Sequence, residues 1–213
     1  MREDNGDVKY YIAQIQSIDE RKTLEIELKN QKEALYKVNI ILERMATEDS
    51  LTEIANRRKF MLWFDSEMTR MARNPVPISL AIADVDFFKS YNDDYGHLEG
   101  DFALKNIARE LKHTLRSQDK VARFGGEEFI LLFPETDERG CLLACERLRK
   151  SVESLTTLRR TVTISLGAVT YHPKKGRLVH FDDLLKVADS KLYEAKKSGR
   201  NQVKMTSVED SEA

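Results

Sequence analysis

Hydrophobic positions recur at gaps of four and three residues between positions 24 and 45. The members of this seam are Leu24, Leu28, Gln31, Leu35, Val38, Leu42 and Met45. Charged residues occupy the other faces, as a solvated helix requires. About three heptads of this pattern predict a coiled coil over residues 17–46 that joins two chains as a homodimer. An amphipathic helix that packs on its own domain would give the same pattern.

The segment before the seam is different. Residues 8–16 (VKYYIAQIQ) alternate loosely and are rich in β-branched and aromatic residues, which predicts a strand with no local partner. The following SIDERKTLE resembles the segment that closes PAS sensor domains, with Ser17 and Asp19 departing from that pattern. We therefore interpret residues 1–16 as the C-terminal remnant of a PAS domain.

After residue 46, short apolar runs alternate with helical patterns. Strands are predicted at 78–86, in a hairpin at 121–133 around Gly125-Gly126, at 161–171 and at 201–205. Helices are predicted at 99–116, 138–155 and 181–199. This order indicates an α+β domain over 47–204, with a central, mostly antiparallel five-stranded sheet and helices packed on it. We expect residues 205–213 to form a disordered tail.

Composition limits the classes of partner. Lys+Arg 35 and Asp+Glu 36 give a net charge of −1, so nothing suggests nucleic acid or an anionic membrane. No apolar run approaches the roughly 18 residues of a membrane span, and the N-terminus lacks the apolar segment of a signal peptide. We therefore expect a cytoplasmic chain without a membrane segment. Cys141 and Cys145 are interpreted as core residues.

Carboxylates stand where two apolar strands end. Asp84 lies at the end of the run 78–86, and Glu127 and Glu128 follow the Gly-Gly tip of the hairpin. A buried carboxylate is costly unless it is paired or bound to a metal. Two carboxylates that face one another would suit Mg²⁺, which leaves ligand positions for phosphate oxygens. The alternative is an ordinary turn with two exposed glutamates.

Several spaced motifs point to one family. RFGGEEF (123–129) with DVDFFKSYNDDYGHLEGD (84–101) resembles the GGDEF family of diguanylate cyclases, in its GGEEF variant. DSLTEIANRR (49–58) is similar to the opening motif of that family, with Glu53 replacing a glycine and Ile54 a leucine. TISLGA (163–168) and ADSKLYEAKKSGRN (188–201) match its last strand and closing helix. The resemblance implies an enzyme that condenses two GTP into cyclic di-GMP and releases two pyrophosphates.

The resemblance also implies residue roles. Asp84, Glu127 and the Val85 carbonyl would hold catalytic Mg²⁺ or Mn²⁺, and Glu128 would support that site. The implied substrate-binding residues are Phe87, Phe88 and Lys89 for the phosphates, Asn92 and Asp101 for guanine, and Lys196 and Arg200 for the terminal phosphates. Lys89 would also stabilise charge on the reacting phosphates. In isolation, the guanine readers could be capping residues, and the two cations an ordinary basic helix end.

Arg116 and Asp119 match the RxxD product-binding motif of many members of this family. The resemblance therefore implies feedback inhibition by cyclic di-GMP, with Arg147 as a secondary contact. A surface ion pair is the alternative for the motif. For the whole chain, the alternatives are a non-catalytic receptor for cyclic di-GMP or GTP and a structural dimerisation module. Family members that act only as receptors usually lose the motif carboxylates, which this chain retains, and a dimerisation module leaves these polar residues unexplained.

Overall fold

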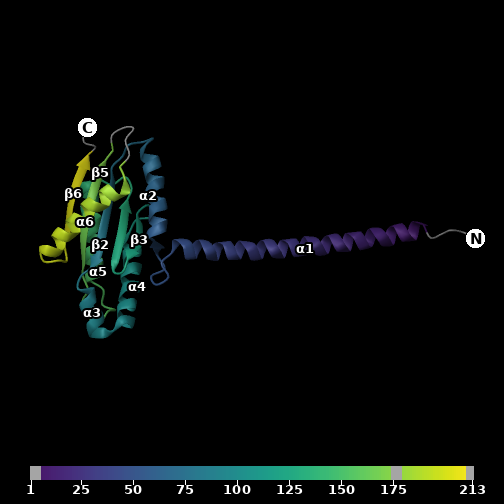
Figure 1. Ribbon diagram of the computed structural model, residues 1–213, viewed down its shortest axis with the longest axis horizontal. Coiled ribbons are helices and arrows are strands. Elements are labelled where there is room, and N and C mark those ends of the chain that lie inside the picture. Colours follow the sequence, from purple (N-terminus) through teal and green to yellow (C-terminus); the bar gives the residue numbers. More distant parts are fainter. Residues whose placement is uncertain (1–5, 174–178, 210–213) are drawn as a thin grey trace, which may run out of the picture. The chain divides into compact units, whose positions relative to one another are not determined.

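The computed structural model describes residues 6–173 and 179–209, and the chain divides into two compact units, Met1–Met45 and Ala46–Ala213. The first unit contains most of helix α1 (Gly6–Thr47), the purple and blue helix of Figure 1. Among the described residues, no helix is long and apolar enough to cross a bilayer.

Helix α1 confirms the helix predicted for residues 17–46 but corrects the segment before it. Residues 8–16 are helical, so the predicted strand is wrong. Once a helix is nucleated, each further residue adds a hydrogen bond, and this propagation outweighs a weak β preference. The interpretation as a PAS remnant depended on that strand and has no support in the structure. Residues 1–5 lie outside the described part.

The seam of α1 is apolar and exposed in the single chain. Leu28 is 52% exposed, Leu35 61% and Leu42 56%. Contiguous exposed apolar side chains of this kind mark a surface that binds another protein. The pairing of two such helices stays a prediction.

The second unit is built on a six-stranded sheet in the order β1-β3-β4-β2-β5-β6. Its strands are β1 (Ala55–Asn56), β2 (Ile78–Val85), β3 (Lys120–Gly125), β4 (Glu128–Phe133), β5 (Ile164–His172) and β6 (Val203–Glu209). The three central pairings are antiparallel, whereas β1–β3 and β5–β6 are parallel. The predicted α+β class is confirmed, and the strand beyond the predicted five is the two-residue β1.

The predicted tail is partly wrong. Residues 205–209 belong to β6 and pair with β5, so they are ordered by the sheet. Residues 210–213 lie outside the described part. Pairing with a strand that is distant in the sequence leaves no local signal in the residues themselves.

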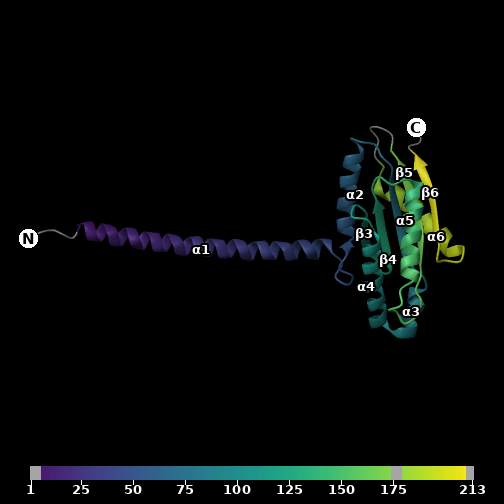
Figure 2. The ribbon, with the colours of Figure 1, turned by 180° about the vertical axis from the view of Figure 1, so that it is seen from behind.

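Helices cover both faces of the sheet, as Figures 1 and 2 show from opposite sides. The residues of α2 (Arg57–Met71) and α6 (Phe181–Lys197) share one hydrophobic cluster. Those of α3 (Phe88–Tyr95), α4 (His97–Thr114) and α5 (Glu138–Glu153) share the other. The helix predicted at 99–116 corresponds to α4, and Gly96, at φ 85°, separates α4 from α3.

The alternation of side chains along the central strands decides where the polar residues point. On β2, Leu80 and Ile82 pack in the cluster of α2 and α6, while Ala81 and Ala83 pack in the opposite cluster. Because side chains alternate across a strand, Asp84 continues the row that faces α6. The row of Ile130 and Leu132 on β4 likewise places Glu128 on that face.

Helix α6 lies directly against β5 at Gly167. A Cβ atom built on Gly167 would lie 2.1 Å from the Ala188 carbonyl oxygen and 2.1 Å from the Leu192 amide nitrogen. Only glycine permits backbones to approach so closely. This contact carries the last turn of α6 to the end of the sheet where Asp84 lies.

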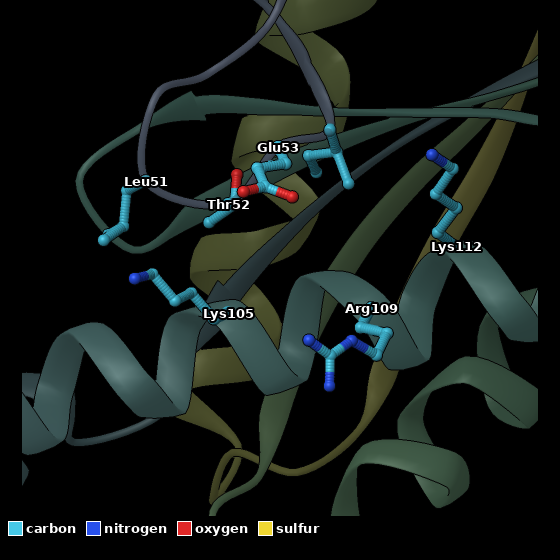
Figure 3. A pocket seen from close by; sticks show the side chains of 7 residues that line it. Leu51, Thr52, Glu53, Lys105, Arg109 and Lys112 are labelled. Carbon is cyan, nitrogen blue, oxygen red and sulfur yellow. The ribbon is translucent and has the colours of Figure 1, made fainter.

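Glu53 occupies a left-handed backbone conformation, with φ 58°. Its loop (51–54) forms one side of a pocket of about 220 Å³, and α4 contributes Lys105, Arg109 and Lys112 to the other side (Figure 3). A residue with a side chain is strained in this left-handed conformation, which explains the glycine that the opening motif of the GGDEF family has at this position. The pocket contains none of the predicted site residues.

Replacing Glu53 with glycine is expected to raise the free energy of unfolding by about 0.5–1 kcal/mol, because relief of the left-handed strain exceeds the entropy that glycine gains in the unfolded chain. Urea unfolding followed by circular dichroism measures this difference. Glu53→Gln is the matched control, since it removes the charge and keeps the strained side chain. Equal stability of both variants would show that charge, and not conformation, governs this position.

Candidate active site

The predicted carboxylates meet at one end of the sheet. Asp84 at the end of β2 is the register partner of Glu128 on β4, so the two lie side by side. Glu127 lies in the hairpin turn just before Glu128, and its carbonyl oxygen accepts a hydrogen bond from the Val85 amide at 3.3 Å. The hairpin predicted from the Gly-Gly pair thus borders β2.

Lys196 on the last turn of α6 forms an ion pair with Asp84. Its Nζ lies 2.8 Å from Asp84 Oδ2, and the two side chains are 33% and 10% exposed. The resemblance assigns these residues to different partners, a phosphate and a metal. In the structure, the two residues pair with each other.

Three carboxylates, those of Asp84, Glu127 and Glu128, lie near Lys196 at this end of the sheet. Burial raises the pKa of Asp84, and Lys196 lowers it through a hydrogen bond and its charge, while Glu127 raises it again. Burial also raises the pKa of Glu128, followed by the charge of Asp84. A group whose charged form is disfavoured in this way gains stability from an added cation.

The carboxylates at this end of the sheet suit a metal ion that needs few protein ligands. Among the described residues, no group of three or more His, Cys, Asp or Glu side chains is placed to hold a metal ion. Mg²⁺ is commonly held by one or two carboxylates together with water and substrate phosphates. Asp84 and Glu127, next to the paired Lys196, are suited to such a site rather than to a complete protein cage.

Phe87 and Arg200 form the next part of the site. Phe87 precedes α3 at φ 55° and is 61% exposed. The Arg200 guanidinium carbon lies 4.4 Å from the centroid of the Phe87 ring. Lys89 is exposed on the first turn of α3, whereas Phe88 is buried and stacks on Tyr91. Three of these predicted phosphate-binding residues are therefore accessible, and Phe88 anchors the helix.

The two predicted guanine readers lie where α3 meets α4. Asn92 Oδ1 is buried without a hydrogen-bond partner, and a Cβ atom on Gly100 would lie 1.8 Å from it. Asp101 follows Gly100 and is exposed. The Asn92 side chain therefore packs against Gly100, the residue directly before Asp101. A buried polar atom without a partner is uncommon and indicates a site that is incomplete without a ligand or water.

Two residues with a clear role were not singled out from the sequence. Arg123 donates from Nε to the Gly126 carbonyl at 2.9 Å and from Nη1 to Asp49 Oδ1 at 3.0 Å. Burial alone would raise the pKa of Asp49, but hydrogen bonds from Thr52 and Arg123 outweigh it and lower the pKa. The pair connects the opening motif to the hairpin tip. The signal was present in two motifs far apart in the sequence, and only the fold brings them together.

The predicted product-binding residues also gather. Asp119 is 8% exposed, and its Oδ2 accepts a hydrogen bond from the Arg116 amide at 3.1 Å. Burial raises the pKa of Asp119, and the charges of Arg116 and Arg147 partly oppose this rise. Asp119 therefore holds its own turn through the Arg116 amide, while both arginines lie close enough to act on its charge.

Comparisons with known proteins agree with this arrangement. The family described as "Diguanylate cyclase, GGDEF domain" matches residues 46–202. Probable diguanylate cyclase DgcC of Escherichia coli (strain K12) is 35% identical over 167 residues, which cover 77% of this chain and 44% of that protein. The chain thus spans less than half the length of this curated relative.

Two solved structures are similar over most of the chain. The coiled coil and GGDEF domain of DgcB from Caulobacter crescentus, in complex with c-di-GMP, has a TM-score of 0.74 and 29% identity. The match covers 86% of this chain and 99% of that one. Diguanylate cyclase SiaD from Pseudomonas aeruginosa, in complex with its activator SiaC, has a TM-score of 0.70 and 31% identity, covering 93% and 75%.

Proposed function

This chain belongs to the family of GGDEF diguanylate cyclase domains, and from that premise we propose that it condenses two GTP molecules into cyclic di-GMP and releases two pyrophosphates. The observation that carries the proposal is the pairing of Asp84 with Glu128 and Lys196 at one end of the sheet, beside Glu127. A cytoplasmic location, where GTP is available, is part of the same proposal.

The carboxylates are proposed to hold the catalytic ion. Asp84, Glu127 and the Val85 carbonyl would be ligands of Mg²⁺ or Mn²⁺, and Glu128 would add negative potential beside Asp84. The ion supplies charge neutralisation for the triphosphate and lowers the pKa of the attacking 3′-hydroxyl. The pKa values of Asp84 and Glu128 are raised chiefly by burial, which disfavours their charged forms, and a bound cation would offset that cost.

The cations are proposed to hold the triphosphate. Lys196 would exchange Asp84 for a terminal phosphate oxygen, and Arg200 would donate to the same phosphates from its place beside Phe87. Arginine suits two-pronged phosphate contacts, and lysine acts as a point charge. Lys89 and the backbone of Phe87 and Phe88 would bind nearer the reacting phosphorus.

Asn92 and Asp101 are proposed to read the guanine base. A carboxylate accepts from the ring N–H and the amino group of guanine, two donors that adenine does not present in this arrangement. If the wrong base enters, the buried Asn92 Oδ1 stays unpaired and the Asp101 carboxylate lacks its donors, and that loss rejects the base. The unpaired Asn92 Oδ1 next to Asp101 supports this role.

The product has two equivalent phosphodiester bonds, so two half-sites with one GTP each must meet. A coiled coil of two α1 helices would raise the effective concentration of the second half-site. The exposed seam of α1 supports this homodimer.

Incubation of the chain with GTP and Mg²⁺, followed by mass spectrometry, tests the proposed function. We expect cyclic di-GMP and pyrophosphate, and no product after chelation of the metal. A dimeric chain that binds cyclic di-GMP tightly but forms no product would instead be a receptor.

Product inhibition through Arg116, Asp119 and Arg147 is also proposed. Arg116→Ala is expected to raise the plateau of cyclic di-GMP in a progress curve and to leave the initial rate unchanged, because it removes a phosphate-binding group outside the active site. Lys112→Ala, which removes an exposed cation from the preceding helix, is the matched control. An unchanged plateau in Arg116→Ala would show that the motif forms only a turn.

A further inference from the structure

Asp86 is a buried carboxylate that the proposed chemistry does not use. It is 6% exposed, and in the described part of the chain no cation forms an ion pair with it. Its Oδ1 accepts from Ser165 Oγ at 2.7 Å, and its Oδ2 accepts from Thr163 Oγ1 at 2.7 Å. A buried carboxylate is kept in a fold where donors satisfy its oxygens, and each of these hydroxyl groups donates to a different oxygen of Asp86.

The third donor to Asp86 is the backbone of the phosphate-binding turn. The Asn201 amide donates to Asp86 Oδ2 at 3.0 Å. Asn201, at φ 46°, and Arg200, at φ 63°, both lie in the left-handed region. Consecutive non-glycine residues in that region are strained and persist only where the surroundings hold them.

Helix α5 holds the same turn from another side. Arg149 Nη1 donates to Asn201 Oδ1 at 2.8 Å, and Asn201 Nδ2 donates to Glu153 Oε1 at 2.8 Å. The Arg200 amide donates to the Ala195 carbonyl of α6 at 3.0 Å. The turn is therefore fixed by three elements, and Asp86 provides the only charged acceptor for its backbone among the described hydrogen bonds.

Asp86 also stands directly before Phe87, whose ring lies 4.4 Å from the Arg200 guanidinium. Phe87 is left-handed as well, with φ 55°. One carboxylate thus joins the two strained segments that carry Phe87 and Arg200. Strain of this kind, held by its surroundings, is characteristic of pre-organised binding sites.

We propose that Asp86 is a positioning residue, which fixes the Arg200–Asn201 turn so that the Arg200 guanidinium is placed for the terminal phosphates of the nucleotide before it binds. The inference rests on the proposed function, because it assumes that GTP is the ligand. Pre-organisation lowers the entropy lost on binding. Loss of Asp86 should therefore weaken recognition of the phosphates that Arg200 contacts and leave recognition of the base unchanged.

The test compares a non-hydrolysable GTP analogue with GMP by calorimetry, in the full chain with Mg²⁺. Asp86→Asn keeps the shape but replaces one acceptor by a donor. We expect it to weaken binding of the analogue by about tenfold, the usual size for loss of a charge-assisted hydrogen bond, and to leave GMP binding unchanged. Ser165→Ala, which removes a bond to the other oxygen of Asp86, should leave the ratio of the two affinities as in the parent.

A cycle with Arg200→Met completes the test. In that background Asp86→Asn should cause no further loss, since the group that it positions is gone. Thr163→Val, which removes the hydroxyl bond to Asp86 Oδ2, the oxygen that accepts from the Asn201 amide, should give a smaller loss with the same selectivity if Asp86→Asn does not fold. Equal weakening of both ligands, or additive effects in the cycle, would overturn the inference. Failure of the parent to prefer the GTP analogue over GMP would instead overturn the proposed function.

Discussion

Replacing Asp84 with asparagine is expected to reduce cyclic di-GMP formation by at least about 1,000-fold, since it removes the negative charge that is proposed to hold the catalytic ion. The change keeps the shape of the side chain at the end of β2. Product formation from GTP and Mg²⁺, measured by mass spectrometry under initial-rate conditions, gives the effect directly.

The same variant should fold at least as stably as the parent near neutral pH. The pKa of Asp84 is raised in the folded chain, chiefly by burial, so folding favours the protonated form. Its contribution to stability is therefore lost as the pH rises from the unfolded pKa through the folded one. A neutral amide does not have this penalty, and Lys196, at 33% exposed, can be solvated when its partner is neutral.

Asp65→Asn on the exposed side of α2 is the matched control for a change of one charge, and it should retain full activity. Thermal unfolding of both variants separates lost chemistry from lost structure. An Asp84→Asn variant that is folded and keeps more than about a tenth of the parent rate would exclude Asp84 from metal binding.

Replacing Leu35 with glutamate is expected to convert a dimer to a monomer and to lower the specific activity at submicromolar enzyme by about 100-fold. Leu35 lies on the apolar seam of α1 and is 61% exposed in the single chain. A charge at the centre of a coiled-coil seam would be buried without a partner, which is strongly unfavourable. Sedimentation velocity reports the assembly state.

The neighbouring Tyr36 provides a close control. It is 68% exposed and apolar, but it lies outside the seam, so Tyr36→Glu should stay dimeric and active. The two variants have the same new charge on the same turn of helix. Because separate domains can still meet by diffusion, the activity of Leu35→Glu should rise more than linearly with enzyme concentration. A monomeric parent, or equal behaviour of the two variants, would contradict the predicted coiled coil.

The sequence predicted those parts of the fold whose signal is local. The hairpin at Gly125-Gly126, the buried strand that ends at Asp84 and the closing helix with Lys196 are each marked by a continuous pattern. The strand predicted at 8–16 is wrong because the β preference of single residues is weaker than the cooperativity of a long helix. The disordered tail predicted from residue 205 is wrong as far as residue 209, because pairing with β5 orders these residues.

The sequence predicted which residues belong to the candidate site but not which of them contact one another. The sequence named Asp84 and Lys196 but could not show that they pair, since this depends on the contact between α6 and Gly167. It also gave no reason to separate Asp84 from Asp86. Their spacing is that of one face of a strand, yet one ends in the cluster of charges and the other among hydroxyl groups and a backbone amide.

The seat of α6 on Gly167 has a consequence for how this domain tolerates change. Because backbone atoms meet there, the closest approach of α6 to β5 is set by the missing side chain at position 167. Any larger residue at position 167 would push α6 away from β5 and would increase the separation between Lys196 and Asp84. A designer who wishes to alter nucleotide preference should therefore keep Gly167 and change the side chains around the proposed nucleotide-binding residues.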